Sequence, residues 1–331
     1  FSRGFDHYDD FTVPLDLGLG LLDDGGSRSS VHHRSTNDQI TLLALSWLDR
    51  RDSAGAPFFL HVFYFDPHYD YLPLEPFDRM FTDPTYTGKQ DGRGIKGLDG
   101  FGLSDADKRH IVALYDGEVR QTDEHVGRLL EALEKRGLDE NTIVVVTGDH
   151  GEEFWDHGGT AHAHSLYDEL LRVPLVIRPV GTGGAGSVAD GLVSHIDLMP
   201  TLLDMCGAEI PARCAGRSLS RTWRGGRDEM DPPAVALHAE VEADLFGVRT
   251  ESLKLIEHAP SGTQELYRLD DDPTEASNLA GIAAAGEFAE LQDLLGAFKR
   301  KRPVGDGDGS GGPPELDKEL LSKLRSLGYV K

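Results

Sequence analysis

The stretch that decides the fold, residues 142–164, reads T-I-V-V-V-T-G-D-H-G-E-E-F-W-D-H-G-G-T-A-H-A-H. Near its start, Ile143 to Val146 is an unbroken run of β-branched residues. Such a run predicts a strand buried on both faces, as in a parallel sheet. Asp149 and His150 follow directly after the strand. In open α/β sheets, ligands bind at this position, beyond the carboxyl end of a strand.

Asp149 and His150 have the chemistry of a divalent-cation site. The aspartate offers a hard oxygen, the histidine a borderline nitrogen, and Gly151 lets the backbone approach closely. Three further histidines follow in the same stretch: His157, His162 and His164. We therefore predict that Asp149 and His150 bind a metal ion. The alternative is that Asp149 caps the next helix and that the histidines are solvated loop residues.

A second candidate residue follows another apolar run. Phe58 to Phe65 predicts a second buried strand, which leads directly into Asp66-Pro67-His68. Proline has no N–H to donate to a sheet, so Pro67 ends the strand and places His68 on a loop at its end. His68 is therefore a candidate for a site at the same edge of the sheet, although a purely structural histidine would fit the pattern as well.

Other patterns outline the rest of the chain. Ser104 followed by Asp107 resembles a capping box, and it predicts the start of a long helix that closes at Lys135-Arg136-Gly137. After residue 234 the pattern changes to short strands separated by turns: Phe246 to Arg249, Leu253 to Ile256 and Glu265 to Leu269. A terminal helix is predicted from Glu315 to Tyr329.

Taken together, these motifs resemble the sulfatase family of the alkaline phosphatase superfamily. Asp149-His150-Gly151-Glu152 is similar to the D-H-G-E block of that family, and residues 165–175 are similar to the segment that follows it. The loop around His68 resembles the family's F-x-D-P-H-x-P-Y loop. Residues 265–279 resemble the E-L-Y-D-L-x-x-D-P-x-E-x-x-N-L ending of sulfatases.

The resemblance implies an α/β fold with a large mixed sheet sandwiched by helices, as in alkaline phosphatase, and a small C-terminal antiparallel sheet subdomain. The expected divisions are a sulfatase-type α/β catalytic domain at 1–232, missing its N-terminal strand and nucleophile, a small antiparallel α+β subdomain at 233–302, and a linker with a terminal helix at 303–331.

The resemblance also implies an activity and cofactors. The expected function is metal-dependent hydrolysis of a sulfate ester, with this chain as the C-terminal part of a sulfuric ester hydrolase. The family's usual cation is Ca²⁺, but His150 stands where many sulfatases have asparagine, and its nitrogen leaves Mn²⁺ open. The formylglycine nucleophile is expected upstream, because no residue here matches its motif. The chain alone should therefore be inactive.

Two histidines are implied as catalytic residues. His68 matches the family histidine that contacts the sulfate group and the leaving oxygen. His162 stands where many sulfatases have a lysine that contacts the sulfate oxygens and the leaving group. An imidazolium can supply the same N–H donor and also titrates near neutral pH. His157 and His164 remain alternatives for this role.

Two other functions stay open. One is a phosphodiesterase or phosphonate monoester hydrolase of the same superfamily, since sulfate and phosphate esters present similar tetrahedral oxyanions. The other is a non-catalytic metal-binding fragment.

The expected partner is a small sulfate ester or a sulfated glycan. The 57 acidic and 33 basic side chains give a formal net charge of -24, which opposes binding to nucleic acid or anionic membrane. No apolar run is long enough to span a bilayer. Two cysteines, Cys206 and Cys214, are interpreted as structural. The sequence assigns no compartment, although the resemblance implies a protein that is often exported.

Overall fold

The computed structural model describes residues 5–9, 36–51, 56–95, 98, 100, 102–181, 186–189, 191–220, 235–239, 244–259, 261–283, 286 and 288–301. The chain divides into two compact units, which are described separately. Unit 1 comprises Phe1–Asp139, Gly158–Ala161 and Pro313–Lys331, and unit 2 comprises Glu140–His157 and His162–Gly312. The domain boundaries predicted at residues 232 and 302 stay predictions.

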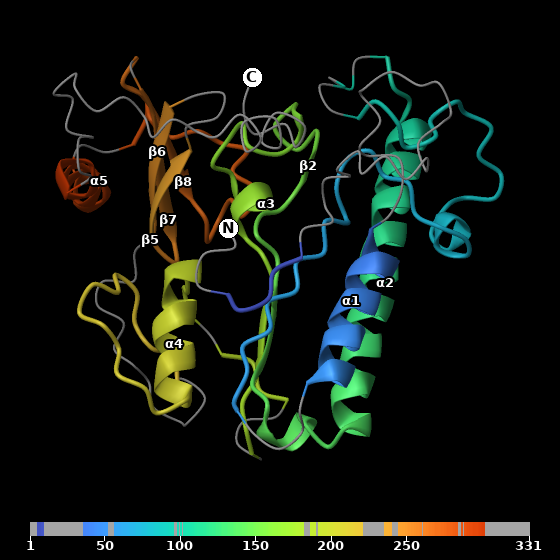
Figure 1. Cartoon of the computed structure of the whole chain (residues 1–331). Coiled ribbons are helices and arrows are strands. Elements are labelled where there is room, and N and C mark those ends of the chain that lie inside the picture. Colours follow the sequence, from blue (N-terminus) through green and yellow to red (C-terminus); the bar gives the residue numbers. More distant parts are fainter. Residues whose placement is uncertain are drawn as a thin grey trace, which may run out of the picture. The chain divides into compact units, whose positions relative to one another are not determined.

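Unit 1 is built around two helices that lie side by side, α1 and α2 (Figure 1). Its elements are α1 (Asn37–Arg50), η1 (Phe77–Arg79), α2 (Asp105–Lys135) and β3 (Thr160–Ala161). A 3₁₀ turn, η2 (Asp139–Asn141), follows α2 along the chain. The predicted capping box is present at the start of α2. The Ser104 hydroxyl accepts the Asp107 N–H at 3.2 Å, and the Asp107 carboxylate accepts the Ser104 N–H at 3.0 Å.

The long helix α2 separates its apolar and polar residues. Ile111 and Leu114 are buried on its inner side, whereas Arg120 and Glu131 lie in exposed ion pairs on its outer side. This separation of the α2 residues is typical of a helix that packs one face against a core.

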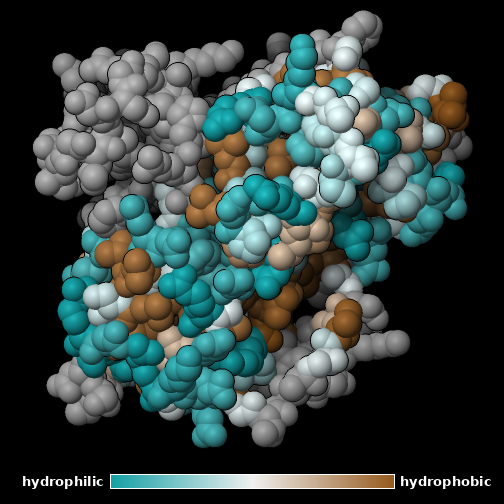
Figure 2. Space-filling model, turned by 90° about the vertical axis from the view of Figure 1, so that its right-hand side faces the viewer, coloured by the Kyte–Doolittle hydropathy of each residue, from teal (hydrophilic) through white to brown (hydrophobic). Residues whose placement is uncertain are grey.

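Hydrophilic residues cover much of the face shown in Figure 2, with apolar residues in smaller areas between them.

The strand predicted at Phe58 to Phe65 is wrong. The segment carries no strand hydrogen bonding, and Phe59 and Phe63 are exposed, by 66% and 43%. Such an apolar run is buried only where neighbouring strands pair with its edges and other elements cover both of its faces. Within the described residues, no strand pairs with this segment.

Unit 2 begins with a two-stranded antiparallel ladder, β1 (Val144–Thr147) with β4 (Leu175–Arg178). The strand predicted over Ile143 to Val146 is therefore confirmed, but the expectation of parallel pairing and burial on both faces is wrong. No residue of β1 or β4 is buried, and the cross-strand partners Val146 and Val176 are exposed by 38% and 62%. Burial of such a run requires strands paired at its edges and other elements packed over both faces. Among the described residues, no third strand pairs with the ladder.

The remaining elements of unit 2 include the predicted C-terminal sheet. They are β2 (Glu153–Phe154), α3 (Asp168–Leu171), η3 (His195–Asp197), α4 (Leu198–Met205), β5 (Val235–Ala239), β6 (Asp244–Arg249), β7 (Leu253–Ala259), β8 (Thr263–Arg268) and α5 (Ala289–Lys301). Strands β5 to β8 form an antiparallel sheet in sequence order, which confirms the small C-terminal sheet.

Helix α5 packs against β6 and β7 of this sheet (Figure 1). Between them lies an apolar core of Phe246, Val248, Leu255, Leu266, Phe288, Leu291 and Leu295. Phe246 and Val248 lie two apart in β6 and therefore point to the same face of the sheet. The predicted terminal helix over residues 315–329 lies outside the described residues.

Two smaller features were also predicted. Cys206 is exposed, Cys214 is partly buried, and both are free thiols. Among the helices that the structure describes, none combines the length and the apolar character needed to cross a bilayer.

Candidate functional site

The loop after β1 is held close to α3. The Gly151 N–H donates to the Leu170 carbonyl at 2.8 Å. A Cβ atom at position 151 would lie 1.9 Å from the Glu169 carbonyl oxygen, so only glycine fits this approach. This contact fixes the backbone position of the loop that carries Asp149 and His150.

Asp149 and His150 lie side by side with their ligand atoms on the same side. The Nε2 atom of His150 is 3.8 Å from Oδ2 of Asp149. Nδ1 of His150 donates to the Gly151 carbonyl at 2.8 Å, because a carbonyl oxygen can only accept. The lone pair of the imidazole therefore resides on Nε2, beside the carboxylate. This is how proteins orient a histidine that binds a metal.

The donor set fits a divalent cation, since it combines one carboxylate oxygen with one neutral imidazole nitrogen. His150 is 31% exposed and Asp149 is 53% exposed, so both ligand atoms can be reached. Within the described ranges, no group of three or more His, Cys, Asp or Glu residues could hold a metal ion. The two predicted ligands therefore lie together, and their binding of a metal ion stays a prediction.

His162 joins these two residues. Its ring lies against that of His150, with centroids 3.9 Å apart and planes tilted by 32°. Its Nδ1 is 3.3 Å from both carboxylate oxygens of Glu152, and both side chains are almost fully buried. Three of the four predicted site residues, Asp149, His150 and His162, are thus brought together in unit 2.

His164 faces a different carboxylate. Its Nε2 lies 2.6 Å from Oε2 of Glu153, whose side chain is 1% exposed. Oε1 of Glu153 accepts the backbone N–H of His157 at 3.0 Å. His164 is therefore turned to Glu153, whereas His162 is turned to Glu152.

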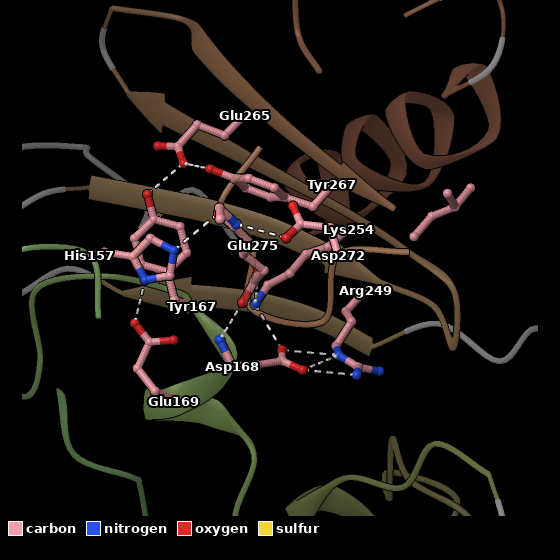
Figure 3. Close-up of polar contacts among 12 residues, drawn as sticks. His157, Tyr167, Asp168, Glu169, Arg249, Lys254, Glu265, Tyr267, Asp272 and Glu275 are labelled. Carbon is pink, nitrogen blue, oxygen red and sulfur yellow. Dashed lines mark hydrogen bonds and ion pairs between the residues drawn. The ribbon is translucent and has the colours of Figure 1, made fainter. Parts of the chain in front are cut away.

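His157 belongs to a separate polar network, drawn in Figure 3. Its Nδ1 lies 2.6 Å from the Glu169 carboxylate, its Nε2 lies 3.1 Å from the Glu275 carbonyl oxygen, and its ring stacks on Tyr167 at 3.6 Å. Both ring nitrogens face acceptors, so the doubly protonated ring satisfies both contacts. Burial lowers the pKa of His157, but the hydrogen bonds to Glu169 and Glu275 outweigh it and raise that pKa. These contacts favour a structural role for His157 over the catalytic alternative.

The same network joins α3 to the C-terminal sheet. The hydroxyls of Tyr167 and Tyr267 both donate to Glu265, at 2.7 and 2.6 Å. Burial, followed by the bond to the Glu265 carboxylate, raises the pKa of both tyrosines. Each tyrosine therefore stays a donor at any physiological pH.

His68 lies in unit 1, where α2 holds its loop. Its Nδ1 donates to the Tyr69 carbonyl at 2.6 Å, and its N–H donates to Oε2 of Glu118 at 3.3 Å. Glu118 also accepts the Leu72 N–H at 2.6 Å. Burial, reinforced by the charge of Asp66, raises the pKa of Glu118 well above its usual range. The position of His68 is thus set by a buried side chain of α2, and its part in the site stays a prediction.

Two buried carboxylates were missed as site residues from the sequence. Glu152 was recognised only as part of the D-H-G-E block and Glu153 was not singled out, but each contacts one of the histidines that follow. The one signal available was the pair of adjacent carboxylates directly after Asp149-His150-Gly151. Nothing in their spacing indicates which histidine each would face.

Comparisons with known proteins place the chain in a family. Residues 4–208 match the family model Sulfatase, and residues 157–300 match the model N-sulphoglucosamine sulphohydrolase, C-terminal. The chain is similar to the multifunctional alkaline phosphatase superfamily protein PehA of Trinickia caryophylli, with 30% identity over 74% of this chain and 55% of PehA. It is also similar to an N-acetylglucosamine-6-O-sulfatase of Bacteroides thetaiotaomicron, with 33% identity over 59% of this chain and 36% of that protein.

Among solved structures, the phosphonate monoester hydrolase of Agrobacterium radiobacter has the same fold, with a TM-score of 0.65 and 26% identity over 83% of this chain and 62% of that one. This confirms the alkaline phosphatase-like α/β fold. The chain spans about half the length of PehA. Since the Sulfatase model matches more than half of its residues, the chain belongs to the sulfatase family of the alkaline phosphatase superfamily.

Proposed function

We propose that the full-length protein hydrolyses sulfate esters with the help of a divalent cation, and that this chain contributes the leaving-group side of the site. The observation that carries this proposal is the meeting of Asp149, His150 and His162 at the end of β1, inside the region that matches the Sulfatase model.

Asp149 and His150 would hold the cation through a carboxylate oxygen and Nε2. Ca²⁺ is the first candidate, from the family, and Mn²⁺ is the second, because a nitrogen ligand suits a transition metal better. When bound, the cation acts as a Lewis acid on the sulfate oxygens. Further ligands would come from residues beyond these two.

His162 would serve as the acid. Attack on sulfur breaks the bond to the leaving oxygen, and a positioned N–H then returns a proton to the departing alkoxide. His68 would contact the sulfate group and the same leaving oxygen. The nucleophile would be a formylglycine from another part of the full-length protein, since no residue of this chain matches its motif.

The substrate would be a small sulfate ester or a sulfated glycan. Similarity to an N-acetylglucosamine-6-O-sulfatase supports a sulfated amino sugar as the first substrate to try. The net charge of -24 repels anions at long range, so the cation and the local histidines would have to attract the sulfate group at short range.

A second candidate is hydrolysis of phosphonate monoesters or phosphodiesters, which the similarity to PehA and to a phosphonate monoester hydrolase favours. The test is the turnover of paired aryl sulfate, aryl phosphodiester and aryl phosphonate substrates by the full-length protein. We expect the highest kcat/KM for the sulfate. A higher value for either phosphorus ester would assign the protein to the second candidate.

The 331-residue chain alone should not turn over sulfate esters, because the metal and acid groups cannot replace a covalent nucleophile. The measurement is steady-state hydrolysis by the purified chain, with mass spectrometry to exclude longer species. Robust turnover would contradict the proposed division of roles. If the full-length protein is also inactive but still binds a cation, the non-catalytic alternative holds.

A further inference from the structure

Glu152 and Glu153 are consecutive buried carboxylates for which the proposed mechanism has no use. Their residues are 9% and 1% exposed. Burying two adjacent carboxylates is costly unless each has a partner that donates to it. Each has one: Glu152 faces Nδ1 of His162, and Glu153 faces Nε2 of His164. The two contacts use opposite nitrogens of the two rings.

The backbone between the two histidines explains how they reach different carboxylates. Residues two apart in an extended strand point to the same side. Ala163 interrupts this pattern with a φ of +70°, in the left-handed region that alanine rarely adopts. The two contacts turn His162 and His164 toward separate carboxylates.

The contact with Glu152 decides which nitrogen of His162 carries the proton. A carboxylate only accepts hydrogen bonds, so the Nδ1 of His162 is the donor. His150 shows the same arrangement, because its Nδ1 donates to the Gly151 carbonyl. The two rings lie against each other at 3.9 Å, and both have Nδ1 engaged by an acceptor of their own loop. In both, a proton on Nδ1 makes Nε2 the basic nitrogen of the neutral ring.

We propose that Glu152 is a positioning residue: it holds Nδ1 of His162 protonated, so that His162 exchanges its proton with the leaving oxygen through Nε2. The second half of this statement rests on the proposed function. The first half concerns only residues of this chain, and it holds or fails independently of what the full-length protein hydrolyses.

The test is two-bond ¹H–¹⁵N correlation spectroscopy on the purified chain with ¹⁵N-labelled histidine, in chelator, at a pH high enough for the ring to be neutral. The signal of His162 is assigned by its loss in His162→Gln. We expect the wild-type ring to show the pattern of the Nδ1–H form. In Glu152→Gln, whose amide can donate as well as accept, the ratio of the two ring forms should move about tenfold or more toward Nε2–H, as expected on losing a charge-assisted hydrogen bond.

The matched control is Glu153→Gln, which removes the neighbouring carboxylate. It should change the pattern of His164 and leave His162 as in the wild type. An Nε2–H pattern for His162 in the wild type overturns the proposal, and so does an unchanged pattern in Glu152→Gln. If Glu152→Gln does not fold, the wild-type pattern decides, since it needs only the assignment by His162→Gln.

The outcomes also separate this inference from the proposed function. An Nδ1–H ring that depends on Glu152, in a protein whose full-length form cleaves no sulfate ester, keeps the positioning role and removes the proposed activity. Sulfate ester hydrolysis by the full-length protein, together with an Nε2–H form of the His162 ring, keeps the proposed activity and removes the positioning role.

Discussion

The ammonium group of Lys254 lies 2.7 Å from the Glu275 carboxylate, and both side chains are fully enclosed. Lys254 also bonds Asp168 at 2.9 Å, and Asp168 receives a second bond of 2.9 Å from Arg249 (Figure 3). Burial raises the pKa of Glu275 and outweighs the effect of Lys254. Burial acts in the same direction at Asp168, but there Arg249 and Lys254 outweigh it and lower the pKa. Asp168 is therefore the firmly ionised carboxylate of the pair.

Replacing Lys254 by methionine should destabilise the chain strongly. The substitution keeps the volume of the side chain but leaves two buried carboxylates without their shared cation. Breaking a buried pair in this way costs about 3–5 kcal/mol of unfolding free energy. Urea unfolding followed by circular dichroism measures the loss.

Lys299→Met is the matched control, because Lys299 pairs with Glu257 of the same sheet at a partly exposed position. Its loss should stay below about 1 kcal/mol, as for surface pairs in general. Equal losses in the two variants would contradict the special role of the buried lysine.

His157 should make the stability of the chain depend on pH. Its folded pKa is raised above the ordinary value of 6.5, so the folded state binds the proton more tightly than the unfolded state does. The stabilisation is fully present below about pH 6.5 and disappears as the pH rises through the raised folded pKa. Thermal unfolding of the wild type and His157→Gln across this window should therefore show a difference that shrinks with increasing pH.

His125 supplies a control of opposite sign. Burial lowers its pKa, and the nearby charge of Asp38 does not reverse this effect. Its folded state therefore prefers the neutral ring, and the stability difference between the wild type and His125→Gln should shrink as the pH falls. The same slope for both histidines would refute the assignment of His157 as the cation of its network.

Asp149→Ala should abolish cation binding by this chain. With two ligands in place, we expect a weak site, with a dissociation constant on the order of 10⁻⁴ to 10⁻³ M. Isothermal titration with Ca²⁺ and Mn²⁺ measures it. Asp156→Ala is the control, since Asp156 is exposed and its carboxylate accepts only from the nearby Phe154 N–H among its described contacts. Equal binding by the wild type and Asp149→Ala would remove Asp149 from the site.

In the full-length protein, His162→Ala should lower kcat by about 10² to 10⁴, the usual contribution of a positioned acid. His157→Ala should lower kcat far less, because His157 lies in the structural network. His162→Lys should retain more activity than the alanine variant and lose the pH dependence of the imidazole. If His162→Ala leaves kcat and its pH profile unchanged, the acid role passes to His164.

Local patterns made part of this structure predictable. The capping box at Ser104 involves residues three apart, so the start of α2 follows from sequence alone. The strands β6 to β8 are short apolar runs separated by turn residues, which is a local pattern. The ligand pair Asp149 and His150 could be found because it follows a strand directly.

The rest depends on contacts between distant residues. The run Phe58 to Phe65 has the composition of a buried strand, but burial is supplied by neighbours that a run cannot specify. The assignment of Glu152 to His162 rests on the left-handed backbone of Ala163, and an alanine gives no sign of such a conformation. The raised pKa of His157 depends on the Glu169 carboxylate and on the Glu275 carbonyl, which lies 118 positions away in the chain.

The exposed cross-strand pair Val146 and Val176 has a consequence for handling the purified chain. An apolar two-stranded ladder with free edges attracts further strands. The net charge of -24 makes copies repel one another, and mutual repulsion of this kind is screened within about 3 Å at 1 M salt. The colloidal stability of the chain is therefore set by ionic strength, so that dilute buffers should keep it in solution and concentrated salt should precipitate it.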